Sequence, residues 1–170
     1  MHRYSIADYM TDAQKLIEEG EILLNEFDHE GAYKKFKKAV KESNDARAFF
    51  GKAEAALGIP SIDSEEIIGD YKKAIELDEN PFYHQALAEF CIEVGKFDTA
   101  EEHYRHASDL DPENRAGYMA DMAVGYRFKA PIMMEKFLAQ GGEEIILRKS
   151  LMYMLEALEI DRETLKELMC

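Results

Sequence analysis

The stretch from Pro81 to Asn114 constrains the fold most, because its apolar residues recur at helical spacings on both sides of a glycine. In the first half, four apolar residues follow one another at intervals of one, three and three positions, so they share one face of a helix. They are Leu87, Ala88, Cys91 and Val94. Gly95 interrupts that face, and Asp98, a favourable N-cap with Glu101 three residues on, predicts the start of a second helix.

The second helix is expected to bury a face on which small and large residues alternate. They are Ala100, Tyr104, Ala107 and Leu110. Small side chains allow two helix axes to approach closely, and the larger ones fill the space beside them. Asp111-Pro112 ends the helix, because proline disfavours the α conformation in the residue before it. Residues 81–114 are therefore expected to form one helix-turn-helix unit of 34 residues.

This pattern closely resembles the tetratricopeptide repeat. The matching residues are Leu87, Ala88, Gly95, Phe97, Ala100, Tyr104, Ala107, Asp111 and Pro112. His84 stands where the family prefers tryptophan, at a position that tolerates substitution. The resemblance implies an all-α, right-handed α-solenoid of helix-turn-helix units with capping helices at its C-terminal end.

The same spacing occurs earlier in the chain and predicts two preceding units. The first unit keeps it at Gly20, Leu23, Ala32, Phe36 and Ala39. The second keeps it around Gly51 and Tyr71, with a longer turn between its helices that starts near Pro60. The expected organisation is an N-terminal arm of residues 1–12, followed by units at 13–44, 45–80 and 81–114.

After Asn114 the pattern decays, and residues 115–170 are expected to form a degenerate fourth unit plus capping helices. Terminal units of a solenoid are atypical because one of their faces has no neighbour. The expected helices are one from Arg115 to Lys129, one beginning at Ala130-Pro131 and ending before Gly141, one from Glu143 to Ile160, and a short one that starts at Asp161 and carries Leu165 and Leu168.

Charge limits the partners that the chain can bind. Acidic residues outnumber basic ones by 35 to 21, which gives a formal net charge of −14. Residues 115–170 hold nine acidic and eight basic residues, so residues 1–114 carry −13 of that charge. This excess argues against nucleic acid or an anionic membrane as a partner and mildly favours a basic protein or peptide. No apolar run is long enough to span a membrane and residues 1–10 lack an apolar signal core, so a reducing cytoplasm is the expected location.

The sequence shows no pattern typical of an enzyme, a cofactor site or a structural metal site. Two cysteines, Cys91 and Cys170, do not make a disulfide framework, and there is no glycine-rich phosphate loop and no nucleophile elbow. His103 and His106 could offer metal ligands three residues apart beside Glu102, but they are expected to face solvent on the second helix of their unit. We therefore expect a non-enzymatic chain without cofactors or metals.

The resemblance implies a binding groove lined by the first helix of each unit. By register, the groove residues that we expect to contact a partner are Ile17, Glu21, Leu24, Phe49, Lys52, Phe82, Gln85, Glu89, Glu93, Met119, Tyr126 and Arg127. The apolar ones could anchor an extended or helical peptide, and the glutamates would favour a basic one. The alternative is that the aromatic residues pack against neighbouring helices.

One function of the family is excluded on the residues. Members that clamp the acidic C-terminal tail of heat-shock chaperones use lysine, asparagine and arginine at fixed groove positions. The matching positions here are Ile17, Glu21, Phe49, Phe82 and Ala86, so none of the clamp residues is present. Glutamates nearby would repel a carboxylate.

Three functions remain open. The first is an adaptor that holds a peptide segment of a partner in the groove. The second is an acidic chaperone for secreted or aggregation-prone clients, since small chaperones of type III secretion are similar in size and repeat number. The third is a self-associating module, because seven of the nine methionines follow Asn114, with Met152 and Leu155 on the expected dimer face of a homodimer.

Overall fold

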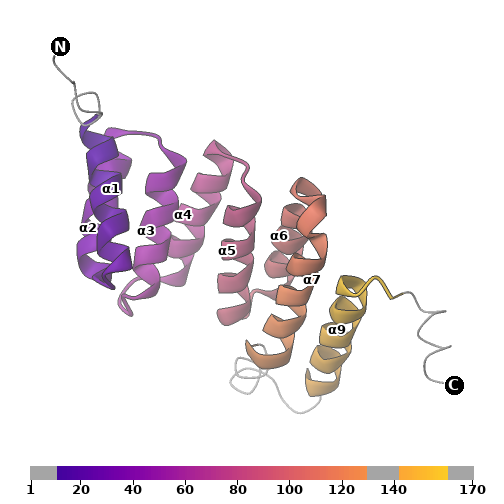
Figure 1. The fold of residues 1–170 in the computed structure, drawn as a ribbon. Helices are drawn as coiled ribbons and strands as arrows, with labels where there is room; N and C mark the ends of the chain where they lie inside the picture. Colours follow the sequence, from indigo (N-terminus) through magenta and orange to yellow (C-terminus); the bar gives the residue numbers. More distant parts are fainter. Residues whose placement is uncertain (1–10, 130–141, 161–170) are drawn as a thin grey trace, which may run out of the picture. The chain divides into compact units, whose positions relative to one another are not determined.

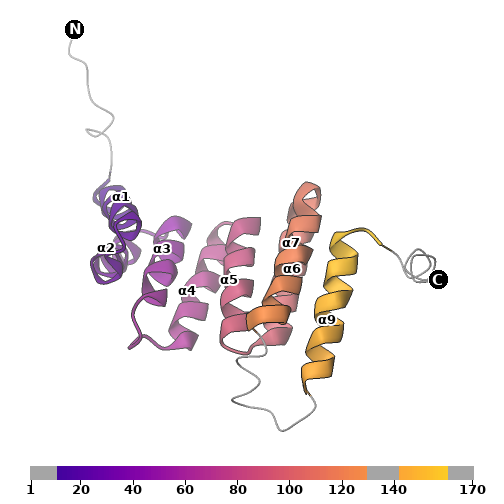
Figure 2. The same cartoon turned by 60° about the horizontal axis from the view of Figure 1, so that its bottom comes forward.

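The computed structural model describes residues 11–129 and 142–160, and every regular element in these ranges is helical. The chain divides into two compact units, residues 1–79 and 80–170, which are described separately. In the first, α1 (Asp12–Asn25) pairs with α2 (His29–Glu42), and α3 (Ala46–Leu57) pairs with α4 (Ser64–Leu77). Figures 1 and 2 show these helices side by side. The prediction of an all-α fold built from helix-turn-helix pairs is confirmed.

Short polar side chains start the helices of the first unit. Thr11 forms a capping box with Gln14, in which each side chain bonds the backbone N–H of the other residue. Asp28, Asp45 and Asp63 accept hydrogen bonds from backbone N–H groups at the starts of α2, α3 and α4. The longer turn predicted between α3 and α4 occupies residues 58–63.

The core of the first unit surrounds the ring of Phe36, which projects from α2. Gly20 of α1 and Gly51 of α3 both approach this ring so closely that a Cβ atom on either would lie within 3 Å of it. Small residues line the rest of the core, namely Ala32, Ala39, Ala48 and Ala55. The alternation of small and large residues in the sequence thus sets how closely these helices pack.

A buried ion pair links the helices of the second pair. Lys52 of α3 donates to Asp70 of α4 at 2.7 Å and to Glu66 at 3.0 Å. Glu66 also accepts a hydrogen bond from the Tyr33 hydroxyl of α2 at 2.7 Å. Burial opposes the charge on Lys52, but its bonds to Asp70 and Glu66 outweigh that cost and raise the pKa of the ammonium group. The network ties α2, α3 and α4 together.

The second unit contains α5 (Pro81–Glu93), α6 (Phe97–Leu110), the 3-10 turn η2 (Pro112–Asn114), α7 (Arg115–Val124), the π-helical turn η3 (Gly125–Lys129) and α9 (Gly142–Ala157). Helix α5 packs on α6, α6 on α7, and α7 on α9. The predicted N-cap of α6, Asp98, was wrong by two residues. The helix begins at Phe97 after Lys96, and no side chain caps it, so the capping box between Asp98 and Glu101 does not form.

Glu101 instead lies half-buried between α6, η3 and α9. Its carboxylate accepts hydrogen bonds from the Tyr126 hydroxyl of η3 and from the Lys149 ammonium group of α9. The rings of Tyr126 and Tyr153 stack with centroids 5.6 Å apart. The Glu101 side chain of α6 thereby bonds to both η3 and α9.

Three predicted features lie outside the described residues: most of the N-terminal arm, the helix expected from Ala130, and the helix expected from Asp161.

Candidate protein-binding site

Four predicted groove residues form one stripe along α5. Phe82, Gln85, Glu89 and Glu93 follow one another at intervals of three, four and four positions, which places them on one side of the helix. Phe82 keeps 56% of its surface exposed, Glu93 is exposed, and Gln85 and Glu89 are half-buried. The stripe therefore presents an aromatic ring at one end and carboxylates along the rest of its length.

Side chains from α7 and η3 extend the stripe. The Gln85 amide donates to Asp121 of α7 at 2.7 Å and to Glu89 at 3.3 Å. Lys129 of η3 donates to Glu93 at 2.6 Å. We call Gln85, Glu89, Glu93 and Asp121 the acidic stripe. Asp121 was not predicted for it, because its place depends on how α7 packs.

Two carboxyl groups of the acidic stripe are held in surroundings that disfavour their charge. Burial raises the pKa of Glu89, and the nearby charges of Asp121 and Glu93 raise it further, while Lys129 and Gln85 act in the opposite direction. Burial likewise raises the pKa of Asp121. Lys129 lowers the pKa of both groups but burial outweighs it, so a further cation bound at the stripe would stabilise the charged carboxylates.

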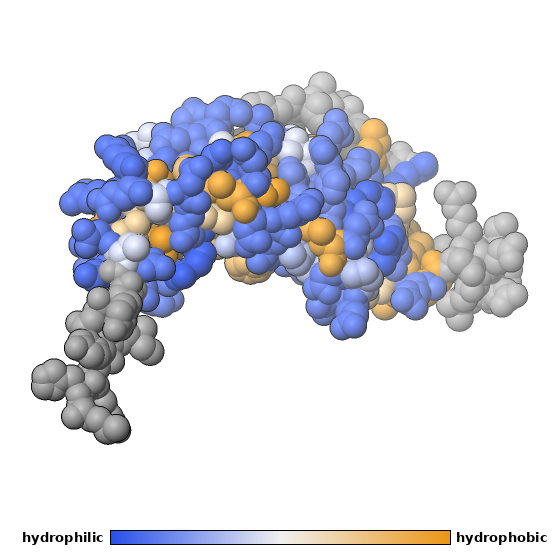
Figure 3. Space-filling model, turned by 90° about the horizontal axis from the view of Figure 1, so that it is seen from above, coloured by the Kyte–Doolittle hydropathy of each residue, from blue (hydrophilic) through white to orange (hydrophobic). Residues whose placement is uncertain are grey.

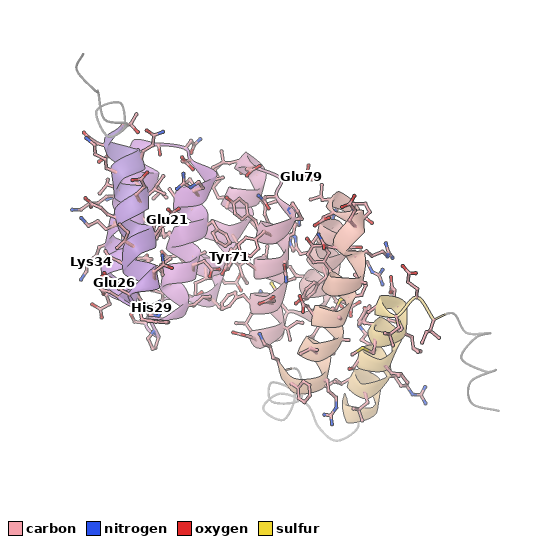
Figure 4. All side chains as sticks on the ribbon, viewed as in Figure 1. Glu21, Glu26, His29, Lys34, Tyr71 and Glu79 are labelled. Carbon is pink, nitrogen blue, oxygen red and sulfur yellow. The ribbon has the colours of Figure 1, made fainter. Side chains whose placement is uncertain are left out.

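In the first unit, three predicted groove residues lie on α1 and α3. Glu21 accepts from Arg47 of α3 at 2.8 Å, and Figure 4 shows it on the side of α1 that faces α3. Leu24 is half-buried against the core around Phe36, and Phe49 is half-buried as well. Glu21 therefore bonds within the unit, and these three residues form no charged cluster comparable to the acidic stripe.

The structure corrects four of the predicted groove residues. Ile17, Lys52, Met119 and Tyr126 are buried and cannot contact a partner at the surface. Ile17 belongs to the core around Phe36, Lys52 faces α4, and Tyr126 stacks on α9. The physical reason is that each first helix contacts several neighbours, which cover more of its circumference than the sequence register suggested. Arg127 is exposed and lies over the Phe128 ring, 5.3 Å from its centroid.

An apolar pocket that the sequence did not predict lies between α7, η3 and α9. Its volume is about 410 Å³, and its lining includes Val124, Phe128, Leu147, Leu151 and Met154. Met152 of the predicted dimer face is exposed and Leu155 is half-buried. Figure 3 shows hydrophobic surface at this end of the second unit.

The three histidines of the second unit, His84, His103 and His106, pack against one another. His84 is buried, and its Nδ1 lies 2.8 Å from Nδ1 of His103, a hydrogen bond in which one ring donates and the other accepts. The His106 ring packs against the His84 ring. Within residues 11–129 and 142–160, no three histidine, cysteine, aspartate or glutamate side chains are arranged to hold a metal ion.

The tetratricopeptide repeat family matches residues 83–114, which form α5, α6 and the turn after them. The chain therefore contains a tetratricopeptide repeat. A solved structure, the crystal structure of MamA, shares the fold of this tetratricopeptide-repeat chain with a TM-score of 0.68. The two are 16% identical, and the match covers 95% of this chain and 85% of the other. Comparison with the curated protein sequences gives no match.

This fold supports protein partners in general. None of the helices in the described parts of the tetratricopeptide-repeat chain is long and apolar enough to cross a lipid bilayer.

Proposed function

We propose that this tetratricopeptide-repeat protein is a non-enzymatic adaptor that binds a basic peptide segment of another protein along α5. The observation that carries the proposal is the acidic stripe, in which Gln85 bridges Glu89 and Asp121 and burial raises the pKa of both carboxyl groups. A lysine or arginine side chain of the partner would supply a further positive charge. Phe82, at the end of the stripe, would contact an apolar residue of the same peptide.

The electrostatic part of this binding is expected to depend on salt. Glu93 is exposed and Glu89 is half-buried, so dissolved ions screen their attraction for a cation only in part. Affinity should fall as the ionic strength rises, and a residual affinity from the contact with Phe82 should remain. At a purely apolar site, the affinity would rise with ionic strength or stay constant.

The test is a screen of an immobilised peptide library with the full chain, followed by titration of the best peptide. The library should contain basic, neutral and acidic peptides of equal length. We expect basic peptides with one aromatic or aliphatic residue to bind best, and Glu89→Gln to weaken that binding roughly 5-fold, which corresponds to about 1 kcal/mol. Phe82→Glu should abolish it and leave the helical content unchanged.

Glu102→Gln is the matched control. Glu102 is an exposed glutamate on α6, outside the acidic stripe, and its replacement removes the same charge from the chain. If Glu102→Gln weakens binding as much as Glu89→Gln does, net charge rather than the stripe attracts the peptide. A preference for neutral or acidic peptides would contradict the proposal outright.

A further inference from the structure

Three helices of the chain end in the same left-handed conformation. The residues concerned are Phe27 after α1, Gly95 after α5 and Glu159 after α9, with φ angles of 61°, 78° and 56°. Among the described residues no other has a φ angle of this kind. A non-glycine residue adopts this conformation only at a cost, so its use at Phe27 and Glu159 indicates a turn that the fold requires.

The hydrogen bonds around these three residues are also the same. In each case the left-handed residue donates its N–H to the carbonyl three positions back, and the next residue donates to the carbonyl five positions before itself. The second set of bonds is Asp28 to Leu23 at 2.9 Å, Lys96 to Cys91 at 2.7 Å and Ile160 to Leu155 at 2.9 Å. This is the Schellman arrangement, which closes a helix and redirects the chain.

Where a second helix follows in the described residues, this arrangement closes the first helix of the pair, although not every first helix has it: α3 ends at Gly58 with a φ angle of −84°. After Phe27 and after Gly95, a second helix begins two residues later and packs back on the first. The second helices α2, α4 and α6 end differently, at residues with negative φ angles, namely Ser43, Asp78 and Asp111. Helix α9 therefore ends as α1 and α5 do, and Asp161 stands two residues after Glu159, where the next helix of a pair would begin.

The residues after Glu159 continue this register. Five residues after Phe27 stands Ala32 of α2, and five residues after Gly95 stands Ala100 of α6. Nine residues after the same two positions stand Phe36 and Tyr104. All four side chains are buried. The corresponding residues after Glu159 are Thr164, which is small, and Leu168, which is large and apolar.

The surface that such a helix would cover is apolar and exposed on α9. Counted back from the left-handed residue, Leu87 and Ala88 of α5 stand at the eighth and seventh positions, and both are completely buried. Their equivalents on α9 are Leu151 and Met152, which keep 57% and 46% of their surface exposed. Helix α9 thus has apolar residues at the positions that α5 buries.

The sizes of the facing residues are complementary as well. In the α1–α2 pair, Gly20 stands seven residues before Phe27 and Phe36 stands nine residues after it. A Cβ atom on Gly20 would lie 2.8 Å from the Phe36 ring. In the α5–α6 pair the same two positions hold Ala88 and Tyr104. The equivalent positions around Glu159 hold Met152 and Leu168. Met152 is larger than Gly20 and Ala88, and Leu168 is smaller than Phe36 and Tyr104, so the smaller second residue offsets part of the added volume of the first.

We propose that residues 161–170 dock on α9 as the second helix of a further pair, with Leu168 packed on Met152. The segment belongs to the same chain and follows directly after α9, so it reaches this surface at a far higher effective concentration than a second molecule does. In the docked state the apolar face of α9 is closed to partners and to a second copy of the chain.

The test is hydrogen exchange on the full chain, followed by mass spectrometry, at low and high protein concentration. We expect backbone amides from Leu165 onward to be protected equally at both concentrations. Leu168→Asp and Met152→Asp should each remove that protection. Lys166→Asp is the matched control. The residues at the equivalent position in the other two pairs, Lys34 and Glu102, are exposed, so this variant should keep the protection.

Protection of α5 and α6 in the same experiment shows that each variant is folded. Absence of protection after Leu165 in the wild type would overturn the proposal. Protection that appears only at high concentration would overturn it too, in favour of a second copy as the occupant. Equal loss in Leu168→Asp and Lys166→Asp would show that the register is wrong.

Discussion

Gly51 of α3 lies against the ring of Phe36, so that a Cβ atom at Gly51 would be 2.3 Å from two ring carbons. Carbon atoms that are not bonded prefer separations of about 3.5–4.0 Å. Phe36 is fully buried, and Gly20 of α1 presents its backbone to the same ring. The ring is therefore held between two glycines, and the packing of α1, α2 and α3 depends on the absence of side chains at those positions.

Gly51→Ala is expected to destabilise the protein although alanine favours the helix. The added methyl group forces the buried ring to move, which lowers the free energy of unfolding by about 1–3 kcal/mol. Gly69→Ala on α4 is the control, because a Cβ there meets nothing within 4 Å. It should raise the free energy of unfolding by about 0.5–1 kcal/mol. Urea denaturation followed by circular dichroism measures both, and changes of the same sign would contradict the tight contact.

Lys52→Met is expected to cost about 3 kcal/mol, because it leaves Asp70 charged and buried without a cation. Burial already outweighs the bond to Lys52 at Asp70 and raises the pKa of that carboxyl group. The double variant Lys52→Met with Asp70→Leu removes both charges and should regain most of the lost stability. Denaturation measures the free energy of unfolding of the single and double variants. If the double variant is no more stable than Lys52→Met, the ion pair between Lys52 and Asp70 itself stabilises the fold.

Glu101→Gln is expected to lower the free energy of unfolding by about 1–3 kcal/mol at neutral pH, because a neutral amide is a weaker acceptor for Lys149 and the two tyrosines. Burial raises the pKa of Glu101, but hydrogen bonds from Lys149, Tyr126 and Tyr153 outweigh it and lower the pKa overall. A carboxyl group with a lowered pKa stabilises the fold above its unfolded pKa, and this contribution disappears as the pH falls through the folded pKa.

The difference in stability between wild type and Glu101→Gln should therefore shrink as the pH falls from about 7 to about 3. Thermal melts across that range measure it. Glu102→Gln is the neighbouring control, since Glu102 is exposed and lies 4.0 Å from the His106 ring, and it should change stability by less than about 0.5 kcal/mol. A gap between Glu101→Gln and wild type that stays constant with pH would rule out a role for the charge of Glu101.

Glu89→Gln is expected to stabilise the protein at neutral pH, by roughly 0.5 kcal/mol, although it weakens peptide binding. The pKa of Glu89 is raised, so ionisation of this carboxyl group costs stability as the pH rises above its unfolded pKa, and glutamine avoids that cost. Glu93→Gln should not stabilise, because Glu93 is bonded to Lys129. Melting temperatures at neutral pH distinguish the two variants, and a lower melting temperature for Glu89→Gln would count against an under-compensated acidic stripe.

Helix positions were largely predictable because their causes are local. Asp28 and Asp63 cap the helices that they precede, and Pro81 begins α5 at the residue expected. The start of α6 was missed because Asp98 has the right residue type for a cap, while the turn at Gly95 places the N-cap two residues earlier, at Lys96. The stripe on α5 was also predictable, since residues three and four positions apart share a helix face.

By itself, the sequence determined the helix pairs and the alternation of small and large residues that lets them pack, because both follow from the periodicity and caps of short segments. Only the tertiary structure decided which groove residues are accessible. Ile17, Lys52, Met119 and Tyr126 have the spacing of surface residues yet are buried, whereas Asp121 joins the acidic stripe from another helix. Exposure depends on contacts between helices far apart in the chain, and a helical period fixes the direction of a side chain but not the neighbour that it meets.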